Sequence, residues 1–323
     1  MTLHLVTFCS HQPFLHLFHK CKLRLDIILL PEARRFLQNW DERVRPLPDN
    51  FELIDLAEAT RRAKAGRYQA AMAHNISDYM DLLKLKLPLV LVMHTSLSSR
   101  ILEERSSIDP DSYRQEFASL VHRTGGQMVF VTQTKRADWQ LEGPVIVAGI
   151  DPDDYPLYSG ELPRLLRVTN HLKQRGGILG YSKHRSICGD VAIDVVGDNP
   201  GLKGAQPASS WDNLKHYYQT RRAFLHTAIP LMEDGFNLAV MEAMATGMPI
   251  ISTANPTSPI IDGHNGYISD DLVRLKEDVA ALMADTALAK RLGLAARDTV
   301  KQHFHFSRFA AQWQELLETL IQG

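Results

Sequence analysis

The chain has 323 residues, of which 45% are hydrophobic and 23% charged, a balance typical of folded globular proteins rather than disordered chains. Its formal net charge of −1 excludes a strong general attraction to nucleic acid or to anionic membranes. Three scattered cysteines, Cys9, Cys21 and Cys188, are too few for a disulfide framework and favour a reducing compartment. The N-terminus reads as a strand rather than a secretory leader, and no apolar run approaches the ~20 residues of a membrane span. We therefore expect a cytoplasmic protein.

Short apolar strands alternate with helical patterns in the first half of the chain. The predicted strands are 3–8, 25–30, 70–73, 89–93, 128–132 and 145–148. The predicted helices are 55–65, 77–85 and 110–122. Ser77 is expected to be the N-cap of the second of these helices.

The same alternation continues in the second half. Its predicted strands are 165–168, 192–196, 223–226, 249–252 and 266–268. Its predicted helices are 173–188, 213–219, 238–246, 275–283, 286–302 and 308–321. Proline, glycine and acidic residues crowd the segment 149–160, which is typical of an exposed connection between domains.

Strands that alternate with helices indicate parallel sheets. We predict an α/β fold with two Rossmann-like, doubly wound domains that face a central cleft, where ligands lie beyond the carboxyl ends of the strands. The first domain spans 1–150, a linker spans 151–164, and the second domain spans 165–305. A last helix, 306–323, is expected to pack back toward the N-terminal domain.

The most informative stretch is 223–252, in which a buried strand enters a loop with Glu233, Asp234 and Gly235 and a helix follows. The amide groups and the positive dipole end of that helix suit a diphosphate. Gly235 lets a ligand approach the backbone closely, and Glu242 lies about one turn into the helix, within reach of a ribose. An alternative is that Asp234 only caps the helix. The predicted binding residues here are Gly235, Phe236, Asn237, Leu238 and Glu242.

This stretch resembles the E-x7-E segment of the retaining glycosyltransferase family four (glycosyl transferases group 1), whose usual form is Glu-Gly-Phe-Gly-Leu…Glu-Ala-Met-Ala-x-Gly-x-Pro. The segments 191–200, 259–268 and 303–313 are similar to other parts of the same family, so the likeness covers roughly 165–320. One departure is that Asp234 stands where the family has its first Glu, with seven residues between it and Glu242.

The resemblance implies a GT-B fold and retaining transfer of a sugar from a nucleotide-diphosphate-sugar donor, without metal or cofactor. It implies that Asp234 orients the sugar and that basic residues after the first strand of the domain clamp the diphosphate. Alignment on the basic-Gly pair places Arg175 at the family's Lys and Asn170 at its Arg, with Lys173 and Arg167 as further cations. An alternative is that these charges form a solvated start of a helix.

The N-terminal half is less similar, because the loop after its first strand, 8–14, has no glycine. His11 and Gln12 are candidates to donate hydrogen bonds there instead. His94 looks like the family's histidine that faces the transferred sugar, so it joins Asp234 as a predicted catalytic residue.

His11, His74 and Asn75 are predicted acceptor-side residues, with a buried structural role as the alternative. The spacing of Cys9, His11, His16, His19 and Cys21 matches no recognised zinc site, so we predict no metal centre.

The first hypothesis is therefore a glycosyltransferase whose acceptor is a carbohydrate, a lipid-linked molecule or a protein. An epimerase or phosphorylase on the same fold is an alternative. A non-catalytic GT-B module that binds a sugar nucleotide or a protein partner is another, favoured by Asp234 and by the loop without glycine. A dinucleotide oxidoreductase is disfavoured, because no G-x-G-x-x-G follows a strand.

Overall fold

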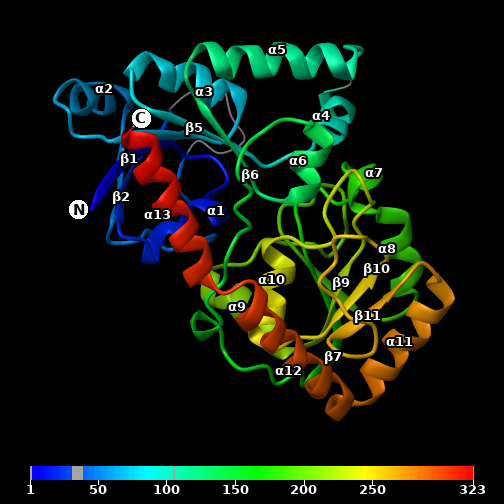
Figure 1. Cartoon of the computed structure of the whole chain (residues 1–323). Helices are drawn as coiled ribbons and strands as arrows, with labels where there is room; N and C mark the ends of the chain where they lie inside the picture. Colours follow the sequence, from blue (N-terminus) through cyan, green and yellow to red (C-terminus); the bar gives the residue numbers. More distant parts are fainter. Residues whose placement is uncertain (1, 31–38, 105, 323) are drawn as a thin grey trace. The chain divides into compact units, whose positions relative to one another are not determined.

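The computed structural model describes residues 2–30, 39–104 and 106–322. The chain divides into two compact units, each built around its own parallel sheet (Figure 1). Unit 1 comprises Met1–Gly149 and Ser307–Gly323, and unit 2 comprises Ile150–Phe306. Within the described ranges, no helix is both long and apolar enough to cross a membrane.

Unit 1 holds a six-stranded sheet in the order β3-β2-β1-β4-β5-β6. Its strands are β1 (Leu3–Phe8), β2 (Leu23–Ile28), β3 (Phe51–Ile54), β4 (Ala70–Ala73), β5 (Leu89–Met93) and β6 (Gln127–Phe130). Each pair is parallel, and β4 and β5 are buried along their whole length, as expected for strands covered on both faces. The strand order reverses between β1 and β4, the position where doubly wound sheets bind ligands.

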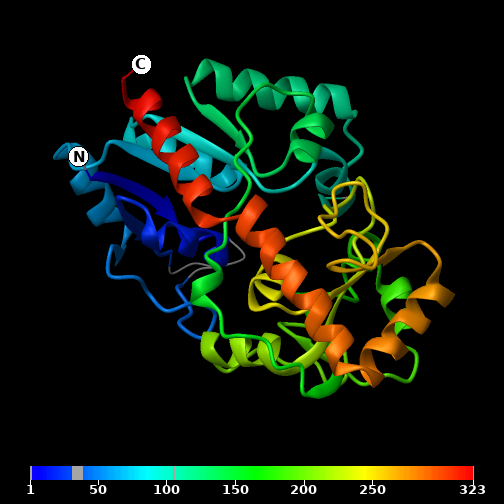
Figure 2. The same ribbon diagram turned by 60° about the horizontal axis from the view of Figure 1, so that its bottom comes forward.

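The helices of unit 1 cover both faces of this sheet. They are α1 (Gln12–His16), α2 (Leu56–Lys64), α3 (Ile76–Leu82), α4 (Leu97–Glu104), α5 (Pro110–Arg123), α6 (Gln133–Trp139) and α13 (Phe306–Gln322). Helices α2, α3 and α5 lie along one face, and α1 and α13 along the other (Figures 1 and 2). Phe14 contacts Phe309 and Phe18 contacts Trp313, with ring centroids 6.0 and 5.2 Å apart. Aromatic packing therefore fixes the last helix of the chain to the first.

Unit 2 holds a five-stranded parallel sheet in the order β11-β10-β9-β7-β8. Its strands are β7 (Leu162–Val168), β8 (Ile193–Val196), β9 (Arg221–His226), β10 (Ile250–Thr253) and β11 (Gly266–Ser269). Its helices are α7 (Gly176–Leu179), α8 (Tyr181–Cys188), α9 (Trp211–Thr220), α10 (Leu238–Thr246), α11 (Leu272–Ala284) and α12 (Thr286–His303). Helices α8 and α11 pack on one face of the sheet, and α9 and α10 on the other. The strand order reverses between β7 and β9.

The predicted strands 3–8, 70–73 and 89–93 are confirmed residue for residue, but one predicted strand of unit 1 is wrong and one strand was missed. The segment 145–148 is no strand, because Val145 makes only an isolated bridge to Phe130. The sixth strand is instead β3, which pairs with β2 at the edge of the sheet. With four residues, β3 is too short to show a clear alternation of buried and exposed positions.

The predicted helix 173–188 is also wrong, because Gly180 divides it into α7 and α8. Gly180 has a φ of +67°, and a Cβ at this position would lie 2.1 Å from the carbonyl oxygen of Thr227. Only glycine combines this backbone conformation with so close an approach. The break therefore holds the loop after β7 against the end of β9.

The segment predicted as the linker, 151–164, lies against unit 2 rather than free of it. The amide of Tyr158 donates to the carbonyl of Thr246, and the Tyr158 hydroxyl donates to the carbonyl of Arg222 at 2.5 Å. Arg297 of α12 donates to the carbonyl of Pro152 at 2.9 Å. These bonds make the segment part of the body of unit 2.

Candidate functional site

Loops of unit 2 meet at the carboxyl edge of its sheet, where the strand order reverses. The loop after β7 begins at Thr169, and the loop after β9 begins at Thr227. His226, the last residue of β9, donates from Nε2 to the carbonyl of Asp234 at 3.4 Å. The predicted sugar-contacting loop is thus anchored to the strand that precedes it.

The loop of Asp234 is held from a second side by the segment after β10. The Gly235 amide donates to Oγ1 of Thr257 at 2.6 Å, and Asn255 donates to the carbonyl of Glu233 at 3.0 Å. A Cβ on Gly235 would lie 2.7 Å from the amide nitrogen of Ser258. The protein's own chain therefore packs against Gly235 and requires a glycine here, while the close approach of a ligand to Gly235 stays a prediction.

The helix α10 begins as predicted at Leu238, but its N-cap is Asn237. The Asn237 side chain accepts a hydrogen bond from the amide of Val240 at 3.0 Å. The alternative that Asp234 only caps this helix is therefore wrong. Asp234 lies three residues before the cap, and only 2% of it is exposed. The amides of the first turn precede the first bond inside the helix and remain the part of α10 suited to an anion.

Glu242 is buried inside unit 2, with 3% of its surface exposed. Its Oε2 accepts a hydrogen bond from the hydroxyl of Tyr218 at 2.9 Å. Tyr218 belongs to α9, so the bond joins two helices of the same face. The sequence indicates only an apolar position for Tyr218, because Leu214 lies one turn earlier on the same side of the helix.

Phe236, predicted for its backbone amide, has a structural role as well. Its ring packs against Phe304 with centroids 5.4 Å apart. This contact packs the segment just before α10 against the residue that follows α12. The prediction that the backbone of Phe236–Leu238 contacts a diphosphate stays a prediction.

The predicted phosphate clamp lies in the turn after β7, before α7. Lys173 is exposed, Arg175 is half-buried, and neither belongs to a long helix. Asn170 accepts a hydrogen bond at Oδ1 from the amide of Asp198 at 2.8 Å, so its oxygen fixes the turn after β8. Of these residues, Lys173 and Arg175 are the cations that the turn presents.

Arg167 is not part of this clamp, contrary to our expectation. Its guanidinium is 1% exposed and donates to Oγ1 of Thr227 at 2.8 Å and to the carbonyl of Leu179 at 3.2 Å. Burial lowers the pKa of Arg167 to about 10. These partners lie at the end of α7 and just after β9. Arg167 therefore connects these two segments next to the position where the strand order reverses.

Three predicted histidines of unit 1 lie together where its strand order reverses. His11 follows β1, His74 follows β4, and His94 follows β5. Nδ1 of His74 and Nε2 of His94 lie 2.9 Å apart, and the His11 ring stacks on His94 with centroids 4.2 Å apart. Phe14 packs edge-on against His94 at 4.7 Å. The structure thus brings together residues that are far apart in the sequence.

Burial controls the charge of this histidine cluster. It lowers the pKa of His74 well below the usual range, helped by His11. It does the same to His94, with further contributions from His11, His74 and Lys135 of α6. Both rings are therefore neutral at physiological pH. Among the described residues, no three His, Cys, Asp or Glu side chains could hold a metal ion.

Asn75, predicted on the acceptor side, is the N-cap of α3. Its Oδ1 accepts from the amide of Asp78 at 2.9 Å, and its Nδ2 donates to the Asp78 carboxylate at 2.8 Å. Ser10 donates to the same carboxylate at 2.9 Å. The predicted cap Ser77 is therefore wrong, and Asn75 serves the start of the helix.

The loop after β1 uses its polar side chains in part for structure. Gln12 is buried, donates to the carbonyl of Asp41 at 2.7 Å and accepts from the amide of Asp41 at 3.0 Å. It therefore holds the segment around Asp41 and is not the ligand donor that we predicted. His11 is exposed and has a φ of 51°, an unfavourable value for a residue other than glycine.

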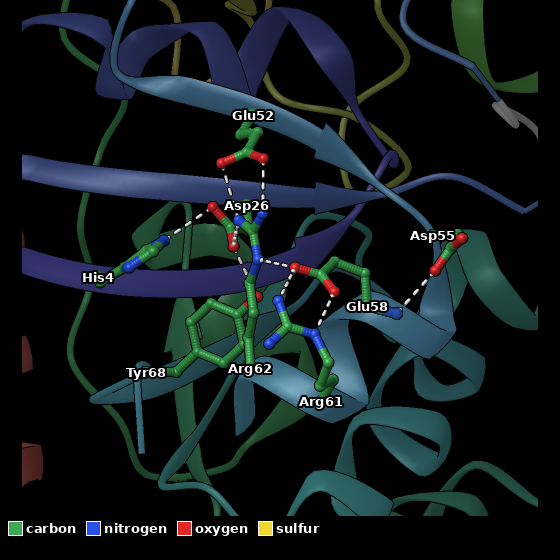
Figure 3. Close-up of polar contacts among 8 residues, drawn as sticks. All are labelled: His4, Asp26, Glu52, Asp55, Glu58, Arg61, Arg62 and Tyr68. Atoms are coloured by element: carbon green, nitrogen blue, oxygen red, sulfur yellow. Dashed lines mark hydrogen bonds and ion pairs between the residues drawn. The ribbon is translucent and has the colours of Figure 1, made fainter. Parts of the chain in front are cut away.

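A charged network in unit 1, which the sequence analysis missed, lies away from the loops. The Asp26 carboxylate accepts from Tyr68 at 2.6 Å and from Arg62 at 2.7 Å, and it lies 2.7 Å from His4. Figure 3 shows Arg62 also reaching Glu52 on the next strand. Asp26 stands inside β2 rather than at its carboxyl end, so we assign the network to stability.

Comparison with known proteins identifies the loop and helix of unit 2. Residues 205–299 match the family model described as Glycosyl transferases group 1. Unit 2 carries a group 1 glycosyl transferase segment. The resemblance predicted from the sequence is thus confirmed, and the matched residues include β9, the Asp234 loop, α10 and β10.

One curated relative and two solved structures are similar to larger parts of the chain. Trehalose synthase of Thermococcus litoralis is 24% identical over 201 residues, which cover 57% of this chain and 46% of that protein. Sucrose-phosphate synthase from Thermosynechococcus elongatus superposes with a TM-score of 0.70 over 99% of both chains at 12% identity. HepE of Anabaena, in complex with UDP and glucose, gives a TM-score of 0.69 at 14% identity, over 98% of this chain and 99% of HepE.

These similarities settle the fold class. The predicted α/β fold with two Rossmann-like units of the GT-B type is confirmed, since the group 1 segment and both solved structures agree. At such low identities the solved structures show the fold alone. The chain spans less than half the length of the curated relatives that it matches.

Proposed function

We propose that this group 1 glycosyl transferase chain moves a sugar from a nucleoside-diphosphate sugar to an acceptor hydroxyl, with retention of anomeric configuration. The match of residues 205–299, centred on the Asp234 loop and α10, carries the proposal. The acceptor is a carbohydrate, a lipid-linked molecule or a protein, and residues of unit 1 bind it. The three cysteines are free thiols, which supports a place in the cytoplasm.

The donor is held by unit 2. Lys173 and Arg175 bind the diphosphate oxygens, and a guanidinium such as that of Arg175 can bind two of them at once. The amide groups at the start of α10 add their partial positive charge. Glu242 binds the ribose and Asp234 orients the sugar. UDP sugars are the first donors to try, because the similar HepE structure was solved with UDP and glucose.

The reaction replaces one bond at the anomeric carbon. Its bond to the phosphate oxygen breaks, and a bond to the acceptor oxygen forms on the same face of the sugar. The proton of the acceptor hydroxyl passes to the departing phosphate oxygen, so the chain supplies no general base and the step uses no metal ion. The cations and helix amides stabilise the charge that develops on the diphosphate, which lowers the barrier.

A panel of UDP, GDP, ADP and CMP sugars, screened by thermal shift, identifies the donor, because a bound ligand raises the apparent stability. Transfer is then measured with a library of sugar and lipid-linked acceptors, and the anomeric configuration of the product is read by NMR. Arg175→Ala should lose donor binding, whereas Arg185→Ala, which changes an exposed arginine of α8, should keep it. Equal donor binding by both variants would contradict the proposal.

One observation favours a second candidate, a non-catalytic module that binds a sugar nucleotide. The loop after β1 is occupied by His11 and by the buried Gln12. Such a module would bind the donor but release neither nucleotide nor product with any acceptor. Even slow hydrolysis of the donor would exclude this candidate, and an isomerised nucleotide sugar would indicate an epimerase instead.

A further inference from the structure

Two histidine rings in unit 1, one buried and one half-buried, share one hydrogen bond, and that bond restricts where their protons can lie. Nδ1 of His74 and Nε2 of His94 lie 2.9 Å apart, with the ring planes 30° from parallel. His74 is 3% exposed, and its other nitrogen, Nε2, is buried and has no hydrogen-bond partner among the described residues. His94 is half-buried, and its hydrogen bond to His74 uses Nε2 rather than Nδ1.

Each neutral ring carries one proton, so two arrangements satisfy the bond. In the first, His74 donates from Nδ1, and its buried Nε2 is a bare lone pair. In the second, His94 donates from Nε2, and the buried Nε2 of His74 must carry a proton that has no acceptor. Buried backbone N–H groups without an acceptor are rarer in proteins than under-satisfied backbone carbonyls, and a buried ring N–H without an acceptor is unfavourable for the same reason. The surroundings therefore favour the first arrangement.

We infer that His74 is a positioning residue, which donates from Nδ1 to His94 and so keeps the proton of His94 on Nδ1. His94 then meets a ligand as a neutral hydrogen-bond donor and not as a general base. The role of His94 in transfer rests on the proposed function. There, the Nδ1–H group of His94 would donate a hydrogen bond to an oxygen of the sugar or of the phosphate. The arrangement of protons within the pair does not depend on it.

The neighbours of the pair agree with a neutral donor. The groups that face His94 are His11 at the N-cap of α1, His74 after β4 and Lys135 in α6. Each of them, together with burial, lowers the pKa of His94. Among the described residues, no carboxylate counts among the causes of this shift. The stacked ring of His11 also limits rotation of His94.

Ring-nitrogen NMR of the ¹⁵N-labelled full chain, without any donor, tests the arrangement directly. In the wild type, both His74 and His94 should carry their proton on Nδ1. His74→Phe removes the donor and should leave His94 as a mixture of tautomers, whereas His74→Asn keeps an N–H near Nδ1 and should preserve it. His122→Phe, an exposed histidine of α5, should leave the signal of His94 unchanged.

A proton on Nε2 of His94 in the wild type would overturn the inference, as would an unchanged His94 in His74→Phe. The wild-type spectrum decides even where His74→Phe does not fold.

Turnover gives a second readout that packing alone would not produce. His74→Phe should lower kcat by about tenfold to a hundredfold, while the KM for the sugar nucleotide stays unchanged. This range is the one seen when a residue that orients a metal-binding histidine is replaced. His74→Asn should restore most of the loss. A rise in KM together with the fall in kcat, with no rescue by asparagine, would contradict a positioning role. If the spectra agree but the chain has no turnover at all, the proposed function fails and the proton arrangement stands.

Discussion

Tyr218 of α9 donates its hydroxyl to the buried carboxylate of Glu242 in α10 at 2.9 Å. The family pattern predicts that the Glu242 carboxylate binds the nucleotide sugar. The same carboxylate therefore also connects two helices of unit 2. Because it is fixed from within unit 2, a bound ribose would meet an acceptor that is already oriented, which reduces the entropic cost of binding.

Removal of this hydroxyl should weaken unit 2. Tyr218→Phe leaves a buried carboxylate with one donor fewer, and the free energy of unfolding should fall by about 1–3 kcal/mol. Chemical denaturation measures the change. Tyr217→Phe on the same helix removes a hydroxyl that accepts a hydrogen bond from Gln206 at 3.4 Å near the surface, and it should have little effect. Equal stabilities of the two variants would mean that Glu242 does not depend on Tyr218.

Gly235→Ala should disturb the donor loop. The new Cβ would lie 2.7 Å from the amide nitrogen of Ser258 and 2.8 Å from its Cα, and backbone cannot yield as a side-chain end can. We expect a loss of about 1–3 kcal/mol, as in other overpacked positions, measured by thermal unfolding. Gly177→Ala has no atom within 4 Å of its Cβ and serves as the matched substitution. Unchanged stability of Gly235→Ala would show that the segment after β10 is free to move.

The network around Asp26 should make stability depend on acid. Burial alone raises the pKa of Asp26, but hydrogen bonds from His4, Tyr68 and Arg62 outweigh it and bring the pKa below its usual value. The network therefore stabilises the fold above the unfolded pKa of about 4, and the gain is lost as the pH falls through the lower folded pKa. Urea unfolding between neutral and strongly acidic pH measures the loss.

Asp26→Asn should remove this part of the pH dependence, and an equally steep loss in the variant would refute the assignment. At neutral pH, Arg62→Met leaves the Asp26 carboxylate without its guanidinium partner and should cost about 3 kcal/mol or more.

Trp313 should matter to unit 1 because it is 1% exposed and packs on Phe18 across α1 and α13. Trp313→Ala should lower the free energy of unfolding by about 3–5 kcal/mol, the usual cost of a large cavity. Differential scanning calorimetry measures it, with Glu315→Ala on the exposed side of α13 as comparison. A similar midpoint for both variants would mean that α13 contributes little to the unit.

Local signals in the sequence predict much of this fold. The bounds of α10 are correct because Asn237 and Gly247, the latter with a φ of 94°, mark its two ends. Local sequence patterns do not predict a feature that depends on a contact with a distant part of the chain. Gly180 breaks a helix because of the carbonyl of Thr227, and Arg167 is buried because its partners come from other elements.

The candidate site divides in the same way. The Asp234–Glu242 segment is contiguous and recognisable, and it lies within the matched residues. Tyr218 is 24 residues from Glu242, and the bond between His74 and His94 joins two strand ends 20 residues apart. The first pair becomes visible only once α9 and α10 pack side by side, and the second only once the parallel strands place their carboxyl ends at one edge.

Calorimetric titration of nucleoside-diphosphate sugars tests the central claim most directly. One donor, with UDP-glucose tried first, should bind the wild type and Glu277→Gln, an exposed substitution in α11, with equal affinity. Glu242→Gln keeps the shape of the side chain but loses its charge, and it should bind at least about tenfold more weakly, a loss of about 1.4 kcal/mol. Undiminished binding by Glu242→Gln, or no binding of any donor to the wild type, would contradict the account.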